Sequence, residues 1–409
     1  MTLTPPGTAE AISAVLSLRL SGMSILIPLL LMAGCGPDLN PIDPQLDSLP
    51  TAQALGEQGV ASYSCGSLMF DWTQSVWAFG IHRLFAATGD AQWQDCYRSW
   101  MDDALVDFEG SDAESFHSSD SMSPSTLAAT LMLEDGSSDY QAITDAADRY
   151  LGEAPRLANG AIAHWGMDNP YGFETDQVWI DSLFMFGAYL VRMYAHTGDD
   201  AYLDLYLDQY TAFADLCRDP AAQLYRHSWD DSEQINIPAG EVYWARGNSW
   251  VLVSAAELLN TVEPGSDAWQ TIQPLYVAQA EAFLASQDPE DGLWHTVLNA
   301  PMGDDPDNYT ETSASALIGY GLTRGLEAGA LEGQDWNNAV VRAAVGIMNR
   351  LDERSDGKLI IEGTSFGTNP METYEDYVGI QQVDDMMLGY GPAIMLLTEA
   401  HGMSMPRED

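Results

Sequence analysis

The feature that most constrains the fold is a pattern that occurs twice: an apolar helical segment, a stop at Thr-Gly-Asp, and a second helical segment. Gly ends a helix readily and Asp caps the start of the next one, so this pattern is typical of a hairpin of two helices. The two copies span residues 71–105 and 178–217. Further hairpins are expected over 125–150, 249–287, 313–351 and 384–401.

Six helix pairs predict an all-α domain that closes into a double ring of six inner and six outer helices. An assembly of ordinary helices without a repeat is the alternative. Three turns place a His close to a Trp, at 159–165, 224–229 and 291–295. Each follows the second helix of a pair, so we expect them to gather at one rim.

The charge balance excludes two classes of partner. Of 409 residues, 61 are acidic and 15 are basic, which gives a formal net charge of −46. Such a surface repels nucleic acid and anionic lipid. The acids are scattered in ones and twos, which favours a solvated acidic shell, as in salt-adapted proteins.

The first residues are typical of an export signal. An apolar run over 25–33 is too short to span a bilayer and is followed by Gly34 and Cys35. This resembles a bacterial lipoprotein signal, so we expect a signal peptide over 1–35, a lipid on Cys35 and anchoring at the cell envelope, in the periplasm or on the outer membrane. A plain cleaved signal peptide is the alternative. A Pro-rich tether is expected over 36–58, and the folded domain over 59–409.

The other cysteines, Cys65, Cys96 and Cys217, are interpreted as small core residues. Because they are odd in number, at least one thiol stays free in an oxidising compartment. Cys65 and Cys96 are the only pair worth testing for a disulfide. The spacing is no metal signature, so the cysteines predict no metal site.

One carboxylate, Asp181, interrupts an otherwise apolar helical stretch over 176–193. A carboxyl group that is buried without a partner keeps its proton, and a proton held near neutral pH is what a general acid needs. The alternative is that Asp181 caps the helix or pairs with an Arg.

A second stretch, Tyr-Trp-Ala-Arg-Gly-Asn-Ser-Trp at 243–250, surrounds Arg246 with aromatic side chains. A guanidinium is costly to bury without an anion. Trp244 and Trp250 are therefore interpreted as faces for sugar rings, and Arg246 as the partner of a substrate uronate or of a catalytic Asp. A packed loop without function is the alternative.

Five motifs follow one another along the chain: Val-Trp-Ile-Asp-Ser-Leu-Phe-Met at 178–185, Tyr-Arg-His-Ser-Trp at 225–229, Trp-Ala-Arg-Gly-Asn-Ser-Trp at 244–250, Asp-Gly-Leu-Trp at 291–294 and Asn-Tyr-Thr-Glu-Thr-Ser-Ala-Ser-Ala at 308–316. In this order they resemble motifs of the unsaturated rhamnogalacturonyl hydrolases, glycoside hydrolase family 105, relatives of the family 88 unsaturated glucuronyl hydrolases. The resemblance covers about residues 60–400 and implies an (α/α)6 barrel. It also implies a hydrolase for oligosaccharides that end in a 4,5-unsaturated uronic acid, the products of polysaccharide lyases.

The resemblance implies that one Asp protonates C4 of the uronate and activates the water that adds at C5, without a metal, a cofactor or a nucleophilic carboxylate. Asp181 matches this acid. A second family Asp best matches Asp120, whose alternative role is to cap a helix. The residues expected to bind substrate are His164, His227, Arg246, Trp179, Trp244 and Trp250.

Two other functions stay open. A conventional inverting glycosidase on the same barrel needs two carboxylates about 6.5–9.5 Å apart, and a non-catalytic glycan-binding lipoprotein needs no acid. The segment 166–175 is longer than usual in the family, and longer rim loops alter which sugar fits beyond the uronate. The expected partner is an unsaturated oligosaccharide, bound by a monomer or a homodimer.

Overall fold

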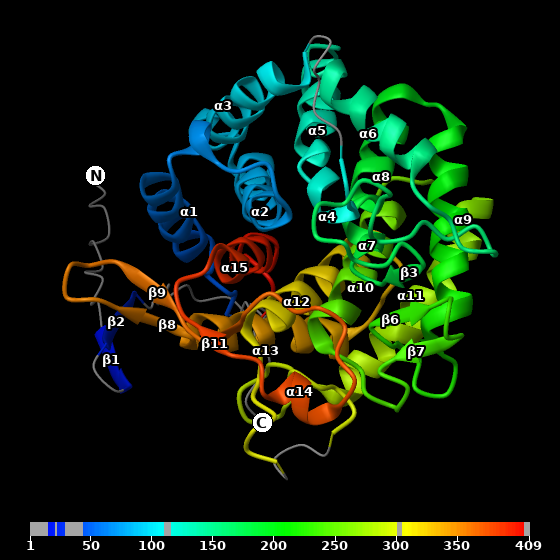
Figure 1. The fold of residues 1–409 in the computed structure, drawn as a ribbon. Helices are drawn as coiled ribbons and strands as arrows, with labels where there is room; N and C mark the ends of the chain where they lie inside the picture. The colour runs from blue at the N-terminus through cyan, green and yellow to red at the C-terminus, as the bar shows by residue number, and fades with distance from the viewer. Residues whose placement is uncertain (1–14, 21–22, 29–43, 110–115, 301–304, 405–409) are drawn as a thin grey trace, which may run out of the picture. The chain divides into compact units, whose positions relative to one another are not determined.

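The computed structural model describes residues 15–20, 23–28, 44–109, 116–300 and 305–404 (Figure 1). The chain divides into two units, Met1–Asp43 and Pro44–Asp409. In the first unit, β1 (Val15–Leu20) and β2 (Met23–Pro28) pair in antiparallel register. Cys35 lies outside the described residues. Within the described part of the chain, no helix has the length and apolar character needed to cross a membrane.

The second unit consists of two concentric rings of helices, each with six members among the described residues (Figure 1). The inner ring is α2 (Trp72–Thr88), α5 (Ser125–Asp135), α8 (Gly187–Thr197), α10 (Ala245–Leu259), α12 (Thr312–Glu327) and α15 (Met387–Glu399). The outer ring is α1 (Leu49–Tyr63), α3 (Ala91–Phe108), α6 (Gln141–Glu153), α9 (Asp200–Cys217), α11 (Asp267–Ser286) and α13 (Gln334–Asn349). Each inner helix packs on the next, and α15 packs on α2 to close the ring. The predicted all-α (α/α)6 barrel is confirmed.

The two Thr-Gly-Asp stops form the helix ends that their sequence predicts. Gly89 and Gly198 adopt left-handed backbone angles, with φ of 65° and 68°, at the ends of α2 and α8. Asp90 and Asp199 then accept backbone N–H groups at the starts of α3 and α9. Each outer helix therefore folds back along its inner partner.

The sixth pair is not the predicted hairpin over 384–401, because that range supplies only α15. Its outer partner is α1, at the other end of the unit, which packs on α15. The expected tether over 36–58 is therefore wrong in its second half: the folded unit begins at Pro44 and α1 begins at Leu49. The Ser48 hydroxyl fixes this closure by donating to the Leu397 carbonyl at 2.6 Å.

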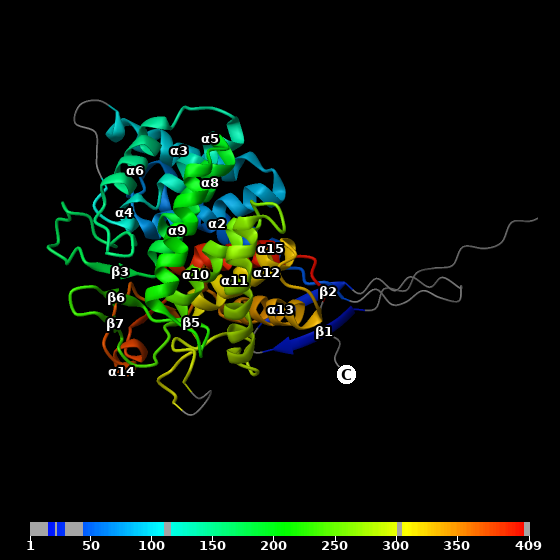
Figure 2. The same ribbon diagram turned by 90° about the vertical axis from the view of Figure 1, so that its right-hand side faces the viewer.

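The short strands and helices that connect each outer helix to the next inner helix lie on one side of the barrel, where Figure 2 shows α4, β3, β6, β7 and α14. The helices are α4 (Ser119–Met122), α7 (Ser182–Met185), α14 (Tyr374–Val378) and the 3-10 turn Cys65–Ser67. One antiparallel sheet has the order β3 (Gln177–Trp179), β6 (Ser228–Asp230) and β7 (Ile235–Ile237). The antiparallel pairs are β4 (Arg218–Asp219) with β5 (Leu224–Tyr225), β8 (Leu351–Glu353) with β9 (Leu359–Ile361), and β10 (Thr364–Ser365) with β11 (Gln382–Val383).

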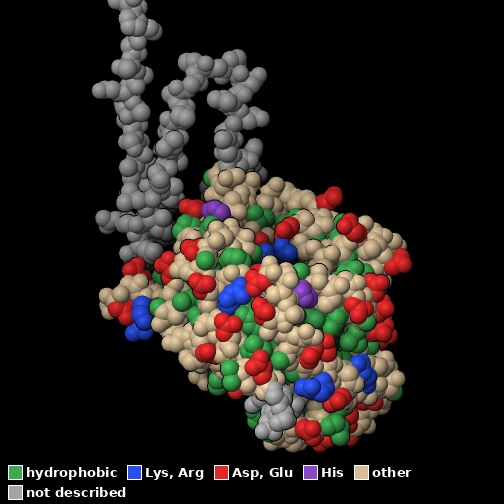
Figure 3. Space-filling model, turned by 90° about the horizontal axis from the view of Figure 1, so that it is seen from above, with side chains coloured by type: hydrophobic (Ala, Val, Ile, Leu, Met, Phe, Trp, Pro, Cys, Tyr) green, Lys and Arg blue, Asp and Glu red, His purple; other side chains and the backbone are tan. Residues whose placement is uncertain are grey.

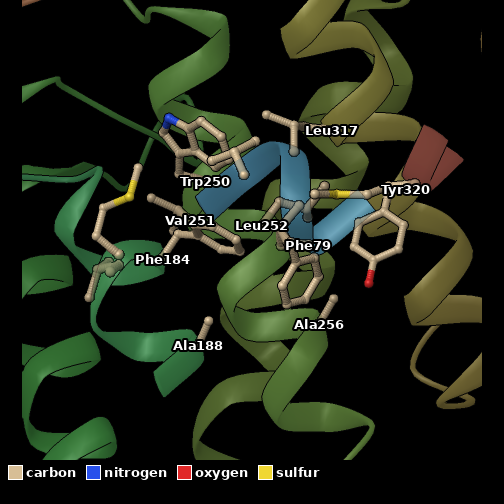
Figure 4. Packing of buried hydrophobic residues seen from close by; sticks show 14 of the residues in the cluster. Phe79, Phe184, Ala188, Trp250, Val251, Leu252, Ala256, Leu317 and Tyr320 are labelled. Carbon is tan, nitrogen blue, oxygen red and sulfur yellow. The ribbon is translucent and has the colours of Figure 1, made fainter. Parts of the chain in front are cut away.

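The core fills the inner ring with side chains from several helices. Figure 4 shows Phe79 of α2, Phe184 of α7 and Leu317 of α12 packed around α10. Every residue of α10 is buried, which explains why its sequence lacks a polar face. The inner ring is thus a solid apolar body, and polar chemistry is left to its ends.

The cysteines take up positions close to those expected. Cys65 and Cys96 form a disulfide that ties the 3-10 turn to α3. Cys217 is buried with a free thiol. Cys65 is half-buried rather than a core residue, because it lies in the turn and not in a helix of the ring.

The acidic side chains are spread over the surface rather than gathered in one patch, as the face in Figure 3 shows. Few Lys and Arg side chains interrupt them on this face. This distribution agrees with the scattered acids of the sequence and leaves no basic surface here for a polyanion.

Toward the carboxyl ends of the inner helices, charged groups are buried together around Glu257 of α10. Its carboxylate accepts from Arg192 of α8 at 2.7 Å and from the Tyr320 hydroxyl of α12 at 2.6 Å. Arg324 of α12 approaches it at 3.5 Å. Burial alone would raise the pKa of Glu257, but the guanidiniums of Arg192, Arg324 and Arg83 outweigh burial and hold it well below its usual range. The anion therefore joins three inner helices.

We expect Glu257→Gln to lower the free energy of unfolding at pH 7 by about 3–5 kcal/mol, because it leaves buried guanidiniums without their anion. The folded pKa of Glu257 lies below its unfolded value of 4.5, so its stabilisation is present above pH 4.5 and is lost as the pH falls toward the folded pKa. Urea denaturation of both proteins should show the difference shrinking below pH 4.5. The exposed control Glu263→Gln should match wild type, and equal stability of the two variants at pH 7 would contradict the network.

Candidate active site

The candidate site lies at the amino-terminal ends of the inner helices, on the side with the short strands and α14 (Figure 2). Asp181 immediately precedes α7, and Arg246 lies in the first turn of α10. Asp120 lies in the first turn of α4. His227 lies between β5 and β6, and its carbonyl accepts the N–H of Ile180 at 3.0 Å.

The first feature of the site is a contact between Asp181 and His227. Oδ2 of Asp181 lies 3.1 Å from Nε2 of His227. The side chain of Asp181 makes no cap to α7, so the helix-cap alternative is wrong; the side chain that faces it here is the imidazole of His227 rather than an Arg. Oδ2 and Nε2 are both buried, but they are not aligned for a hydrogen bond with each other. Neither atom has another hydrogen-bond partner among the described residues. An acid with an unshared oxygen is thus held against an imidazole.

The other ring nitrogen of His227 is fixed by Tyr377 of α14. Its hydroxyl lies 2.8 Å from Nδ1 and accepts the backbone N–H of Met371 at 3.1 Å. Because the hydroxyl oxygen already accepts the N–H of Met371, we assign the hydroxyl proton to the hydrogen bond with Nδ1, which places the ring proton on Nε2, the nitrogen nearer Asp181. Burial raises the pKa of Tyr377 well above its ordinary value, with a further contribution from the charge of Asp181, so the hydroxyl keeps its proton.

A second Asp and His pair lies beside the first. Oδ2 of Asp120 is 3.6 Å from Nε2 of His164, whose ring stacks on Trp179 at 3.9 Å. Ser118, not Asp120, caps α4 through a reciprocal capping box, so the cap alternative for Asp120 is wrong. Asp120 is thus available to the site.

Hydroxyl groups tie the second pair to the first. Nδ1 of His164 lies 2.9 Å from the Ser119 hydroxyl and 3.1 Å from the Ser182 hydroxyl. The two hydroxyls are 2.9 Å apart. Because Ser119 precedes Asp120 and Ser182 follows Asp181, this triangle fixes the spacing of the two acids.

Arg246 is almost fully buried, and its Nη atoms are occupied by the protein. They donate to the carbonyls of Ser365 at 2.8 Å and Phe366 at 2.6 Å, and to the Thr368 hydroxyl at 3.1 Å. Glu311 lies 3.9 Å away and accepts the N–H of Ser365 at 2.8 Å. Burial lowers the pKa of Arg246, while the charges of Glu311 and Asp181 oppose the shift. These contacts fix the segment 365–368 against Arg246, while its expected pairing with a substrate uronate or a catalytic Asp stays a prediction.

The three expected tryptophans lie in different places. Trp244 packs against His227, with ring centroids 4.3 Å apart, and lies under the guanidinium of Arg246. Trp179 stacks on His164. The expectation that Trp250 binds a sugar is wrong. Trp250 is fully buried in the core and stacks on Phe184 at 5.0 Å (Figure 4), because it lies one turn into a helix that is covered on every side.

Sequence reasoning missed Tyr377 and the role of Glu311. Glu311 lies within the Asn-Tyr-Thr-Glu motif, and an acid before a Ser-rich helix start is a capping signal: it accepts the N–H groups of Ser313 and Ala314 at the start of α12. Tyr377 belongs to no quoted motif and lies 150 residues from His227, so no local pattern announces their contact. Among the described residues, no group of three or more His, Cys, Asp or Glu side chains is arranged to hold a metal ion.

Comparison with known proteins places this geometry in context. Residues 57–404 match the model of Glycosyl Hydrolase Family 88. Unsaturated rhamnogalacturonyl hydrolase YesR of Bacillus subtilis is 28% identical over 331 residues, which cover 81% of this chain and 89% of that protein. The structure of a possible member of the GH105 family from Klebsiella pneumoniae superposes with a TM-score of 0.76 at 23% identity, covering 90% of this chain and 98% of the other. Unsaturated glucuronyl hydrolase of Bacillus sp. GL1 gives 0.66 at 18% identity, covering 86% and 95%.

We expect Tyr377→Phe to shift the tautomer of His227 from Nε2–H toward Nδ1–H by about fivefold, because one hydrogen bond worth about 1 kcal/mol to the Nε2–H form is lost. The 15N resonances of the imidazole, measured in the labelled protein, report the tautomer directly. His164 serves as the internal control, since its Nδ1 partners are Ser119 and Ser182. Unchanged His227 resonances would mean that Tyr377 does not set the tautomer.

Proposed function

We propose a reaction for these residues from the premise that this chain belongs to Glycosyl Hydrolase Family 88. The protein is a glycoside hydrolase that removes a terminal 4,5-unsaturated uronic acid from oligosaccharides, as the names of its relatives indicate. The observation that supports Asp181 as the catalytic acid is its position: it is buried, it does not cap α7, and it lies against His227.

Asp181 acts as the acid and then as the base. Its carboxyl transfers a proton to C4: the π electrons of the C4=C5 bond form the new C4–H bond, the C4–C5 single bond remains, and the positive charge at C5 is shared with the ring oxygen. Water adds its oxygen to C5 and returns a proton to the carboxylate. As the bond from C5 to the ring oxygen breaks, the C5 hydroxyl gives up its proton and becomes a ketone, and the ring oxygen takes a proton and becomes a hydroxyl on C1. The hemiacetal now at C1 collapses to an aldehyde and releases the second sugar with its hydroxyl restored.

The neighbours of Asp181 support both roles. Nε2 of His227 lies 3.1 Å from the carboxylate, and the positive end of its N–H dipole stabilises the charge of the carboxylate after the proton has left. Asp120 and His164 form the second pair, at the spacing fixed by the Ser119 and Ser182 hydroxyls. Their part is to orient the uronate and the water, so Asp120 assists the acid without replacing it.

We expect Asp181→Asn to lower kcat by about 10²–10⁴-fold, because the amide carries no acidic proton and cannot act as the base. The measurement follows the ultraviolet absorbance of the conjugated double bond, with unsaturated disaccharides from pectin, rhamnogalacturonan and glycosaminoglycan lyases as substrates. The exposed Asp204→Asn on α9 is the matched control.

Two outcomes would overturn the assignment. If Asp181→Asn retains wild-type rates, the acid lies elsewhere. If wild type leaves the absorbance unchanged but cleaves saturated disaccharides, the chain is a conventional inverting glycosidase, and a folded protein that binds the sugars without cleaving either kind is a glycan-binding protein.

We also propose that the protein is exported and lipid-anchored through Cys35. The motif Leu-Met-Ala-Gly-Cys at 31–35 motivates this, and the disulfide between Cys65 and Cys96 supports an oxidising compartment, since cytosolic thiols keep such pairs reduced. Expressed in a bacterium fed with labelled palmitate, the wild-type protein should carry label in the membrane fraction and Cys35→Ser should not. Label on both proteins, or on neither, would contradict the anchor.

A further inference from the structure

A loop between α6 and β3 (Figure 1) exposes aromatic side chains that the proposed reaction does not use. In this loop, residues 166–176, Tyr171 is 66% exposed and Phe173 is 42% exposed. Asn169 fixes the loop from within: its side-chain nitrogen donates to the carbonyls of Gly166 and Phe173, each at 3.1 Å, and its oxygen accepts the N–H of Phe173 at 3.0 Å. The aromatic side chains are thus presented to solvent on an ordered loop.

These rings are continuous with the active site. Trp179, two residues before Asp181, meets Trp165 edge to face with ring centroids 5.9 Å apart. Phe173 stacks on Trp165 at 4.7 Å and 20°, and Tyr171 lies 5.7 Å from Trp165. Exposure rises along this path, from 6% at Trp179 to 66% at Tyr171. A row of rings therefore leads from the catalytic acid to the solvent.

We propose that Tyr171 and Phe173 form a binding subsite for the sugar released from the unsaturated uronate, and that this sugar is an uncharged pyranose. The inference rests on the proposed function. A row of aromatic faces at the rim of a catalytic site is the lining that a sugar ring with apolar C–H faces fits, and exposed aromatic groups on an ordered loop mark such contacts.

The charge of the loop selects against anionic sugars. Asp168 and Glu174 are exposed on it, Asp176 lies at its end, and the sequence holds no Lys or Arg between Arg156 and Arg192. A sulfate or a second uronate over this loop would meet these carboxylates at short range and be repelled. A neutral hexose or deoxyhexose meets no such penalty.

One neighbouring side chain can become cationic. The ring of His117 lies 5.9 Å from that of Tyr171 and 6.3 Å from that of Trp165. Because an imidazole loses its positive charge as the pH rises, the comparison of neutral and anionic sugars is made on the alkaline side of neutrality.

The first test compares substrates with and without the second sugar. The double variant Tyr171→Ala/Phe173→Ala should raise KM about tenfold for an unsaturated uronate linked to a neutral pyranose, because two ring contacts are removed. KM for the methyl glycoside of the same uronate, and kcat for both substrates, should stay at wild-type values. Tyr171→Phe keeps the ring face and should match wild type, while Leu133→Ala, at an exposed apolar position on α5, controls for truncation as such.

The second test addresses charge. Asp168→Asn/Glu174→Gln should raise kcat/KM roughly threefold for a sulfated second sugar at low salt and leave the neutral substrate unchanged, because the repulsion is removed. An equal effect on both substrates would overturn the selection by charge.

Failure of the subsite and failure of the reaction give different results. If wild type consumes both substrates and the double variant has wild-type KM for each, the subsite is wrong and the proposed hydrolysis stands. If wild type consumes neither substrate, the proposed hydrolysis fails, and the subsite, which rests on it, falls as well. A KM increase that is equal for the methyl glycoside would show that the loop acts on the uronate instead.

Discussion

The site depends on the buried contact between Arg246 and Glu311. Both side chains are almost fully buried, and buried charges are costly unless an opposite charge and hydrogen bonds compensate them. Glu311 caps α12 and accepts the N–H of Ser365, while Arg246 at the start of α10 donates to the carbonyls of Ser365 and Phe366. Two inner helices and a segment near the end of the chain are thereby fixed to one another.

The position of His227 follows from that contact. The segment fixed at 365–368 continues into Met371 and α14, whose Tyr377 donates to Nδ1 of His227. His227 in turn faces Asp181. The electrostatic surroundings of the acid are therefore set through a chain of side chains from three parts of the sequence, whereas the apolar barrel supplies only their scaffold.

Features set by interactions between residues that are close in the sequence could be predicted, and features set by contacts between distant segments could not. Gly89 and Asp90 act within one turn, so the hairpin could be recognised locally. The pairing of α1 with α15 joins the two ends of the folded unit, and nothing in the Pro-containing start of α1 announces its partner. The buried position of Trp250 and the contact of Tyr377 with His227 likewise depend on packing between distant segments, which motif matching does not contain.

The acidic surface sets a last constraint on the function. A chain with a net charge of −46 repels an anionic uronate at long range, so affinity must come from the few cations and dipoles near the acid. The cation and the imidazoles of the site face inward: Arg246 is buried, and His227 and His164 each lie against an Asp. Salt screens the long-range repulsion within about 10 Å at 0.1 M but hardly affects these buried contacts. The acidic shell is therefore compatible with an anionic substrate where salt is abundant, and apolar ring contacts on the leaving sugar add affinity that does not depend on charge.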